Sequence, residues 1–170
     1  MIPHERIRAG AGEGFEKRKE NGRKAGYFFI NKLAEIGVAA NDTLDIVCHS
    51  MGFAYAQGII EVIKGNYPDI HLGGYYIIAP ENACSDYVNP TDWDQIWQYG
   101  SDEATLKREG TPWLLDGVAP QCPIKGLPKE KRAFIPETEP QGFVESHLIK
   151  NYGWIFKRTE KEKGYVSPRK

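Results

Sequence analysis

The amino-acid sequence predicts an α/β fold, in which a mainly parallel sheet is flanked by helices. Three observations support this class. Short apolar runs typical of strands alternate with longer segments whose apolar residues recur at helical spacing. The run GGYYIIAP (73–80) is continuously apolar, as in a central parallel strand that is buried on both faces. The length of 170 residues suits one domain with a substantial core.

The first half of the chain predicts a loop, two helices and a strand. Residues 1–14 carry glycines and charges without a period, which favours a loop. From Phe15 onward apolar residues recur every three or four positions, and Gly37 is a natural helix stop. A short buried strand is expected at 44–47, followed by a helix over 53–64. Small residues keep one side of this second helix slim, which predicts close packing against the sheet: Ala54, Ala56 and Gly58.

The second half predicts further strands and a final helix. The helix is expected over 147–157, where apolar residues form one face. Residues 158–170 are charged with mixed signs, so we expect a solvated tail after a single domain that spans residues 1–157. The apolar runs predict three strands after the first one: 73–80, 93–99 and 131–136.

Composition and charge exclude several classes of function. A net charge of −1 gives no case for binding nucleic acid or an anionic membrane. No glycine-rich phosphate loop or metal-ligand cluster is visible, so we expect no cofactor and no metal. The N-terminal MIPHERIRAG lacks the apolar core of a signal peptide and no apolar run could span a bilayer, so the chain as given is expected to be cytoplasmic. The cysteines are odd in number, which predicts free buried thiols at Cys48, Cys84 and Cys122.

The most informative stretch is CHSMG, residues 48–52. A serine with glycine two places later is a weak pattern by itself, but its surroundings strengthen it. A buried strand precedes Ser50 and a helix of small residues follows it, which is the strand–turn–helix order that presents a nucleophilic serine. The helix start favours a developing oxyanion. We therefore interpret Ser50 as a nucleophile; the other reading is a plain strand-to-helix turn.

The sequence VCHSMGFAYAQGII (47–60) resembles the nucleophile elbow of α/β-hydrolases, in the lipase and esterase form G-H-S-M-G. Cys48 stands where that form has its first glycine. The resemblance covers residues 15–157 and implies a partial α/β-hydrolase fold, similar to the second half of the family's domain. It also implies that the backbone N–H of Met51 is a donor in the oxyanion hole.

A serine nucleophile needs a base and an acid. His147 follows the last predicted strand, where the α/β-hydrolase family places its catalytic histidine. His71 is expected at the opposite end of the sheet from Ser50. His4 precedes the sheet and His49 is fixed beside the serine, so both are poor alternatives.

The acid has three candidates. Asp116 lies in LLDGVAPQCPI, and its D-x-V-A-P resembles the D-x-V-V-P turn that often carries the acid in the family, so we favour it. Asp102 directly follows a predicted strand, and Asp86 follows the strand that ends at Pro80. Each of the three could instead be a turn aspartate that bonds its own backbone.

The leading hypothesis is a serine hydrolase that cleaves a small-molecule or lipid carboxylic ester through a Ser–Asp–His triad and an acyl-enzyme. No strand is predicted before Phe15, so the early strands of the family and the loop with the second oxyanion donor have no counterpart here. We expect the open sheet edge beside the elbow strand to be covered by a second copy or by an N-terminal partner segment. The alternative is a non-catalytic interaction domain that uses this edge.

Overall fold

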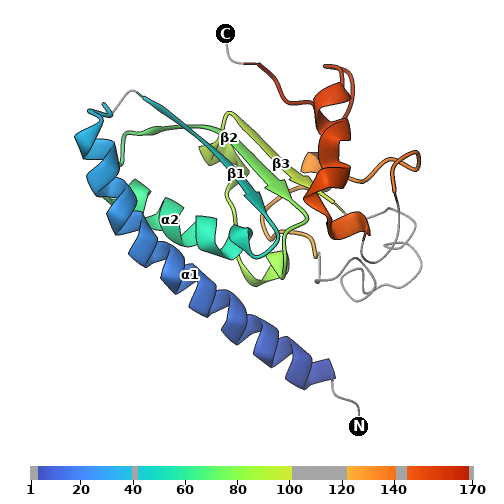
Figure 1. The fold of residues 1–170 in the computed structure, drawn as a ribbon, viewed down its shortest axis with the longest axis horizontal. Coiled ribbons are helices and arrows are strands. Elements are labelled where there is room, and N and C mark those ends of the chain that lie inside the picture. The colour runs from blue at the N-terminus through green and yellow to red at the C-terminus, as the bar shows by residue number, and fades with distance from the viewer. Residues whose placement is uncertain (1–3, 40–41, 101–121, 141–144, 169–170) are drawn as a thin grey trace.

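The computed structural model describes residues 4–39, 42–100, 122–140 and 145–168 (Figure 1). Four parallel strands form one sheet in the order β1-β2-β3-β4, which confirms the α/β class. The main elements are α1 (His4–Glu35), β1 (Thr43–His49), α2 (Gly52–Asn66), β2 (His71–Ile78), β3 (Gln95–Tyr99) and β4 (Arg132–Ala133). Short 3₁₀ helices complete the described chain: η1 (Ala83–Ser85), η2 (Pro90–Asp92), η3 (Lys129–Lys131), η4 (Glu145–His147) and η5 (Ile149–Lys157).

The sheet separates two apolar clusters, because neighbouring residues of a strand point to opposite faces. Tyr75 and Ile77 of β2 belong to the cluster that includes the buried side chains of α2. Ile78, the next residue along β2, belongs to the cluster formed with η5. In Figure 1, α1 and α2 lie on one side of the sheet and η5 lies on the other. Both faces of the central strand are therefore covered.

The two long helices touch through their backbones. A Cβ atom added at Gly22 of α1 would lie 2.0 Å from the carbonyl oxygen of Tyr55. A Cβ at Gly58 of α2 would lie 2.0 Å from the carbonyl oxygen of Lys19. The glycine predicted to bring α2 close to the sheet thus brings it close to α1, because the sheet lies on another side of α2.

Residues 4–14 continue α1, so the prediction of a loop there is wrong. Glycines cost about 1 kcal/mol each within a helix, but extending a formed helix adds one hydrogen bond per residue. The predicted strand at 131–136 is also shorter, since β3 ends at Tyr99 and pairs only with Arg132 and Ala133. The final helix is of the 3₁₀ type, in which residues three apart share one face, and buries Tyr152 and Ile155.

The C-terminal segment is tied to the sheet rather than fully solvated. The Tyr99 hydroxyl donates to the carbonyl of Gly164 at 2.9 Å. The Gln95 amide donates to the carbonyl of Tyr165 at 2.7 Å, and its oxygen accepts from the Ser167 N–H at 3.0 Å. Residues that the charge pattern assigned to a tail therefore contribute to the fold.

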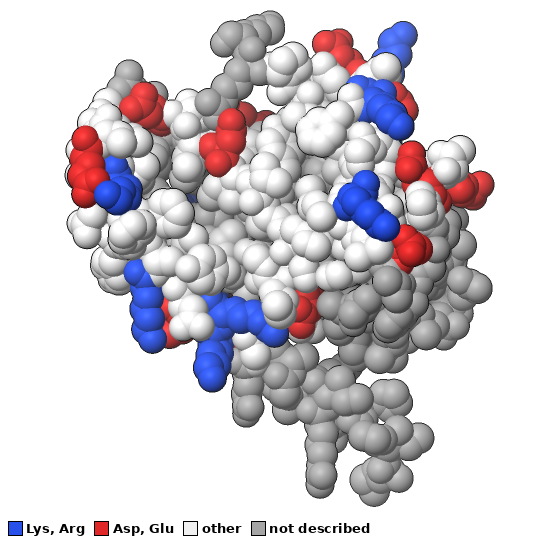
Figure 2. Space-filling model, in the orientation of Figure 1, with Lys and Arg blue, Asp and Glu red and all other residues white. Residues whose placement is uncertain are grey.

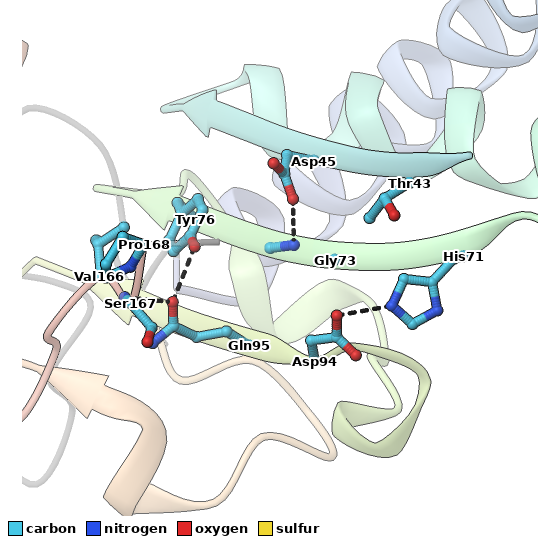
Figure 3. Close-up of a pocket in the computed structure, with 11 residues that line it drawn as sticks. Thr43, Asp45, His71, Gly73, Tyr76, Asp94, Gln95, Val166, Ser167 and Pro168 are labelled. Carbon is cyan, nitrogen blue, oxygen red and sulfur yellow. Dashed lines mark hydrogen bonds and ion pairs between the residues drawn. The ribbon is translucent and has the colours of Figure 1, made fainter. Parts of the chain in front are cut away.

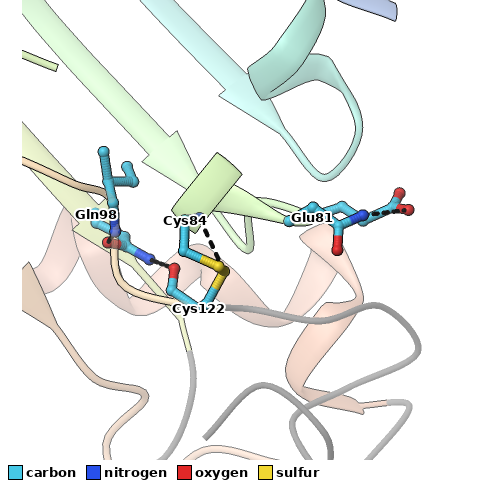
Figure 4. Close-up of a disulfide and its surroundings, with 6 residues drawn as sticks. Glu81, Cys84, Gln98 and Cys122 are labelled. Carbon is cyan, nitrogen blue, oxygen red and sulfur yellow. Dashed lines mark hydrogen bonds between the residues drawn. A yellow bond between two sulfur atoms is a disulfide. The ribbon is translucent and has the colours of Figure 1, made fainter. Parts of the chain in front are cut away.

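Cys84 and Cys122 form a disulfide, so the prediction of free thiols is wrong for these two residues (Figure 4). Their pairing depends on the fold, which brings positions 38 residues apart in the sequence together. Cys48 is free and buried, as predicted. None of the described helices is both long enough and apolar enough to cross a membrane.

Candidate active site

Ser50 occupies a strained turn between β1 and α2. Its φ of +57° lies in the left-handed region, which residues with a side chain rarely adopt. The Ser50 N–H donates to the carbonyl of Ile78 at 3.0 Å, which anchors the turn to the end of β2. The Ser50 carbonyl accepts the N–H groups of Phe53 and Glu81, each at 3.2 Å. The surrounding backbone therefore holds the strained conformation from three sides.

The carboxyl ends of the strands bring a histidine to this serine. His147 belongs to η4, and its Nε2 lies 2.8 Å from the Ser50 Oγ, although the two residues are 97 positions apart. Burial lowers the pKa of His147 below its ordinary value of 6.5, and the neighbouring His49 lowers it further. A neutral imidazole in hydrogen-bond contact with a hydroxyl is suited to accept its proton.

The other ring nitrogen of His147 points to a missing acceptor. When a hydroxyl donates to Nε2, the single proton of the neutral ring is on Nδ1. The His147 Nδ1 is buried, and no hydrogen-bond partner for it lies within the described ranges. A buried donor normally has an acceptor, so the geometry calls for one beside Nδ1. Two of the predicted acids, Asp116 and Asp102, lie outside the described residues.

The third predicted acid, Asp86, has a structural role instead. Its carboxylate lies 2.7 Å from Lys19 Nζ and accepts from the Gln57 amide at 3.3 Å. Lys19 also pairs with Glu61 at 2.6 Å, so this cluster joins α1, α2 and the loop after β2. Asp86 is therefore engaged by the helices rather than by His147.

Cys48 is the other nucleophilic side chain beside the elbow. Its Sγ lies 3.9 Å from the Tyr75 hydroxyl, and the residue is 8% exposed. Burial raises the pKa of the Cys48 thiol to about 12, so the thiol stays protonated at neutral pH. The imidazole of His147 contacts the Ser50 hydroxyl, whereas the Cys48 thiol contacts the Tyr75 hydroxyl.

Met51 caps the start of α2, with φ −58° and ψ −20°. The first N–H groups of a helix have no acceptor within the helix and carry its positive dipole end. The Met51 N–H directly follows Ser50. It is thus suited to stabilise the oxyanion that would form if Ser50 Oγ added to a carbonyl carbon.

Sequence reasoning missed one contact of this site. The Nε2 of His49, the last residue of β1, lies 2.8 Å from the carbonyl oxygen of His147. His49, which the sequence makes a poor alternative as the base, thus contacts the backbone of His147, the predicted base. The signal in the sequence was its position next to Ser50, but the contact itself depends on the fold.

A cavity of about 780 Å³ lies at the amino ends of the strands (Figure 3). His71 lines it, as expected for the end opposite Ser50, and its Nε2 bonds the Asp94 carboxylate at 2.7 Å. Asp45 accepts from the Gly74 N–H at 2.6 Å. The histidine here bonds a carboxylate rather than a hydroxyl, so we place the candidate active site at Ser50 and His147 instead.

Comparison of the chain with protein-family models, with curated protein sequences and with solved structures gives no match. Within the described part of the chain, no group of three or more His, Cys, Asp and Glu residues is arranged to hold a metal ion.

Proposed function

We propose that the protein is a serine hydrolase of the lipase and esterase type that cleaves carboxylic esters, and that its fold is part of an α/β-hydrolase domain. The observation that carries this proposal is the 2.8 Å contact between Ser50 Oγ and His147 Nε2. The left-handed backbone of Ser50 at the carboxyl end of a parallel sheet supports it, since strain of this kind gathers at functional turns.

The reaction follows from the positions of these groups. Ser50 Oγ attacks the ester carbonyl carbon while His147 Nε2 takes the hydroxyl proton, and the resulting oxyanion faces the Met51 N–H. The tetrahedral intermediate collapses, the alcohol leaves with the proton from His147, and an acyl-Ser50 ester remains. Water then adds to this ester with His147 as base, and collapse releases the carboxylic acid and restores the Ser50 hydroxyl.

We assign the acid to Asp116. The segment that contains it begins after Gly100, whose N–H donates to the Ala133 carbonyl at 3.1 Å at the carboxyl end of β3. It ends before Cys122, which is bridged to Cys84 in the loop after β2. Both flanking residues lie at the carboxyl end of the sheet, the end where the buried Nδ1 of His147 needs an acceptor.

A fluorophosphonate probe tests the proposal directly, because it phosphonylates an activated serine and spares ordinary ones. We expect one adduct, mapped by peptide mass spectrometry to Ser50, and none in the Ser50→Ala variant or after heat unfolding. An unlabelled Ser50 in the folded wild-type protein would contradict the proposal.

A second role, in binding a partner, is favoured by the edge of β1. Within the described residues β1 pairs only with β2, and Val47 is 67% exposed. A groove of about 440 Å³ follows this edge and is mostly apolar, with Phe29, Leu44, Ile46, Tyr55, Ile59 and Ile63 in its lining. Asp45 is the charged residue among those that line the groove, and Figure 2 shows mostly uncharged side chains at the centre of this face.

We propose that a strand from a second copy or from an N-terminal partner segment pairs with β1, since an unpaired edge offers backbone donors and acceptors. Sedimentation over a range of concentrations tests the second copy, and we expect a dimer that the Val47→Lys substitution dissociates. A monomer at every concentration would leave the partner segment. Failure of an added apolar strand peptide to bind that monomer would contradict the proposal.

The disulfide bears on the compartment. Bridges such as Cys84–Cys122 persist in oxidising surroundings and are rare in the reducing cytosol. We therefore propose an oxidising compartment in place of the cytoplasm expected from the N-terminal sequence.

A further inference from the structure

One hydrogen bond joins the side chain of His49 to the backbone of His147. His49 Nε2 lies 2.8 Å from the carbonyl oxygen of His147, across 98 positions of sequence. A carbonyl oxygen can only accept, so the His49 imidazole donates from Nε2. This places a proton donor from the last residue of β1 on the backbone of the residue whose ring contacts Ser50.

The other carbonyls of η4 show why this bond matters. The Glu145 carbonyl accepts from the Asn151 amide at 2.9 Å, and the Ser146 carbonyl accepts from the Tyr152 hydroxyl at 2.5 Å. Both donors belong to the neighbouring η5, so those bonds shape the C-terminal segment without fixing it on the sheet. The His147 carbonyl is the one of the three that is bonded to the elbow.

Two adjacent elbow residues thus hold His147 at two points. Ser50 contacts the ring, and His49 holds the backbone from which that ring extends. The two imidazole rings lie 5.2 Å apart between centroids, with 45° between their planes, so they are neighbours without being stacked. The bond to the backbone therefore adds a direct link between η4 and the elbow to the indirect one through η5.

We propose that His49 is a positioning residue that docks η4 on the nucleophile elbow and so sets the distance from His147 Nε2 to Ser50 Oγ. The proposal rests on the proposed function, and it assigns to His49 the positioning of the base and no contact with the substrate. Loss of its N–H donor should therefore lower kcat and leave KM nearly unchanged, because misplacing a catalytic group weakens the transition state selectively.

Two substitutions separate the donor from the bulk of the side chain. His49→Leu removes the N–H, whereas His49→Gln keeps an amide donor at a similar reach. We expect His49→Leu to reduce both kcat for a p-nitrophenyl ester and the rate of fluorophosphonate labelling about tenfold, with KM changed less than twofold. His49→Gln should recover at least half of the wild-type rate, and His71→Leu, a control at the other end of the sheet, should match wild type.

Hydrogen exchange gives a second readout that does not require activity. Peptides that cover residues 145–151 should exchange faster in His49→Leu than in wild type, and at the wild-type rate in His49→Gln and His71→Leu. Unchanged exchange in His49→Leu would overturn the docking role. So would wild-type labelling rates in His49→Leu, or equal losses in the Leu and Gln variants.

The two proposals fail in different ways. If wild-type Ser50 is not labelled while His49→Leu still speeds exchange over 145–151, the docking contact stands and the hydrolase function fails. If wild-type Ser50 is labelled and His49→Leu matches it in both measurements, the hydrolase function stands and the role of His49 fails.

Discussion

Two histidines at opposite ends of the same sheet make contacts of nearly equal length, yet their surroundings differ. At the carboxyl end, His147 Nε2 lies 2.8 Å from the Ser50 hydroxyl, and burial lowers the pKa of the imidazole. At the amino end, His71 Nε2 lies 2.7 Å from the Asp94 carboxylate, and both side chains are more than half exposed. The hydrogen-bond distance therefore does not distinguish the two pairs; the partner atom and the burial do.

The backbone shows the same difference. Three residues other than glycine have positive φ in the described chain: Ser50, Ala79 and Asn82. All three lie in the turns that follow β1 and β2, at the carboxyl end. Backbone strain is stable only where the surrounding structure enforces it, and it gathers at functional turns, so it favours this end as the candidate site. The cavity of about 780 Å³ lies at the other end, so cavity volume is the weaker guide here.

The largest expected effect comes from removing the nucleophile. Ser50→Ala should lower kcat/KM for a p-nitrophenyl ester about 10⁶-fold, because the covalent pathway is lost. Ser167→Ala, which alters a serine in the amino-end cavity, should stay within twofold of wild type. A Ser50→Ala variant with near-normal activity would place the reaction elsewhere.

Removing the histidine at each end of the sheet, in separate variants, tests the difference between the two ends. His147→Ala should reduce kcat about 10⁵-fold, since the hydroxyl of Ser50 then has no base. His71→Ala should leave kcat unchanged and cost less than about 1 kcal/mol of unfolding free energy in a denaturant titration, because exposed ion pairs contribute little. Equal losses of activity in the two variants would remove the distinction between the ends.

The acid can be identified by paired amide substitutions. Asp116→Asn should lower kcat about 10⁴-fold, because an amide cannot hold the His147 ring in the tautomer that accepts from Ser50. Asp102→Asn should have an effect below tenfold. A larger loss in Asp102→Asn would reassign the acid while leaving the nucleophile and the base in place.

The disulfide braces the loops of the carboxyl end. Closing a loop across 38 positions restricts the unfolded chain, so the Cys84→Ser, Cys122→Ser variant should lose about 4 kcal/mol of unfolding free energy in a urea titration. Adding reductant to wild type should have the same effect, and reductant should not change the stability of the double variant. A wild-type unfolding midpoint that is the same with and without reductant would contradict the disulfide.

The smallest expected effect is a shift of the pH profile. The base must be neutral to accept a proton, so kcat/KM should rise with pH through the pKa of His147. Burial and the neighbouring His49 lower that pKa, whereas the carboxylate that we assign to Nδ1 raises it, so the midpoint of the acid limb should fall in the Asp116→Asn variant. An unchanged midpoint in that variant, measured with an uncharged ester, would contradict the assignment of Asp116.

Local sequence patterns predicted three strands, the end of the first helix and the turn at Ser50. The apolar runs located β1, β2 and β3, and the run of β2 is continuous because both faces of that strand are covered. Gly37 marked the end of α1, and the strand–turn–helix order located Ser50. Chain order then selected His147, whose contact with Ser50 the fold supplies.

Features that depend on contacts between residues far apart in the chain could not be predicted from the sequence. The Cys84–Cys122 bridge joins two loops that meet only after the sheet forms, and an odd number of cysteines argued against it. The bond from His49 to the His147 carbonyl involves a backbone group, which has no signature in the sequence. The glycines of residues 4–14 suggested a loop, because local propensity cannot register the extension of a helix from a stable neighbour.

The central claim is that Ser50 and His147 act together as nucleophile and base, and trapping the acyl-enzyme tests it most directly. Wild-type protein is mixed with p-nitrophenyl acetate, quenched in acid within one turnover and digested for mass spectrometry. The account predicts a burst of p-nitrophenol and an acetyl group on Ser50, and neither in the Ser50→Ala variant. Ester cleavage by wild type with no burst and no acetyl group on Ser50 would contradict it.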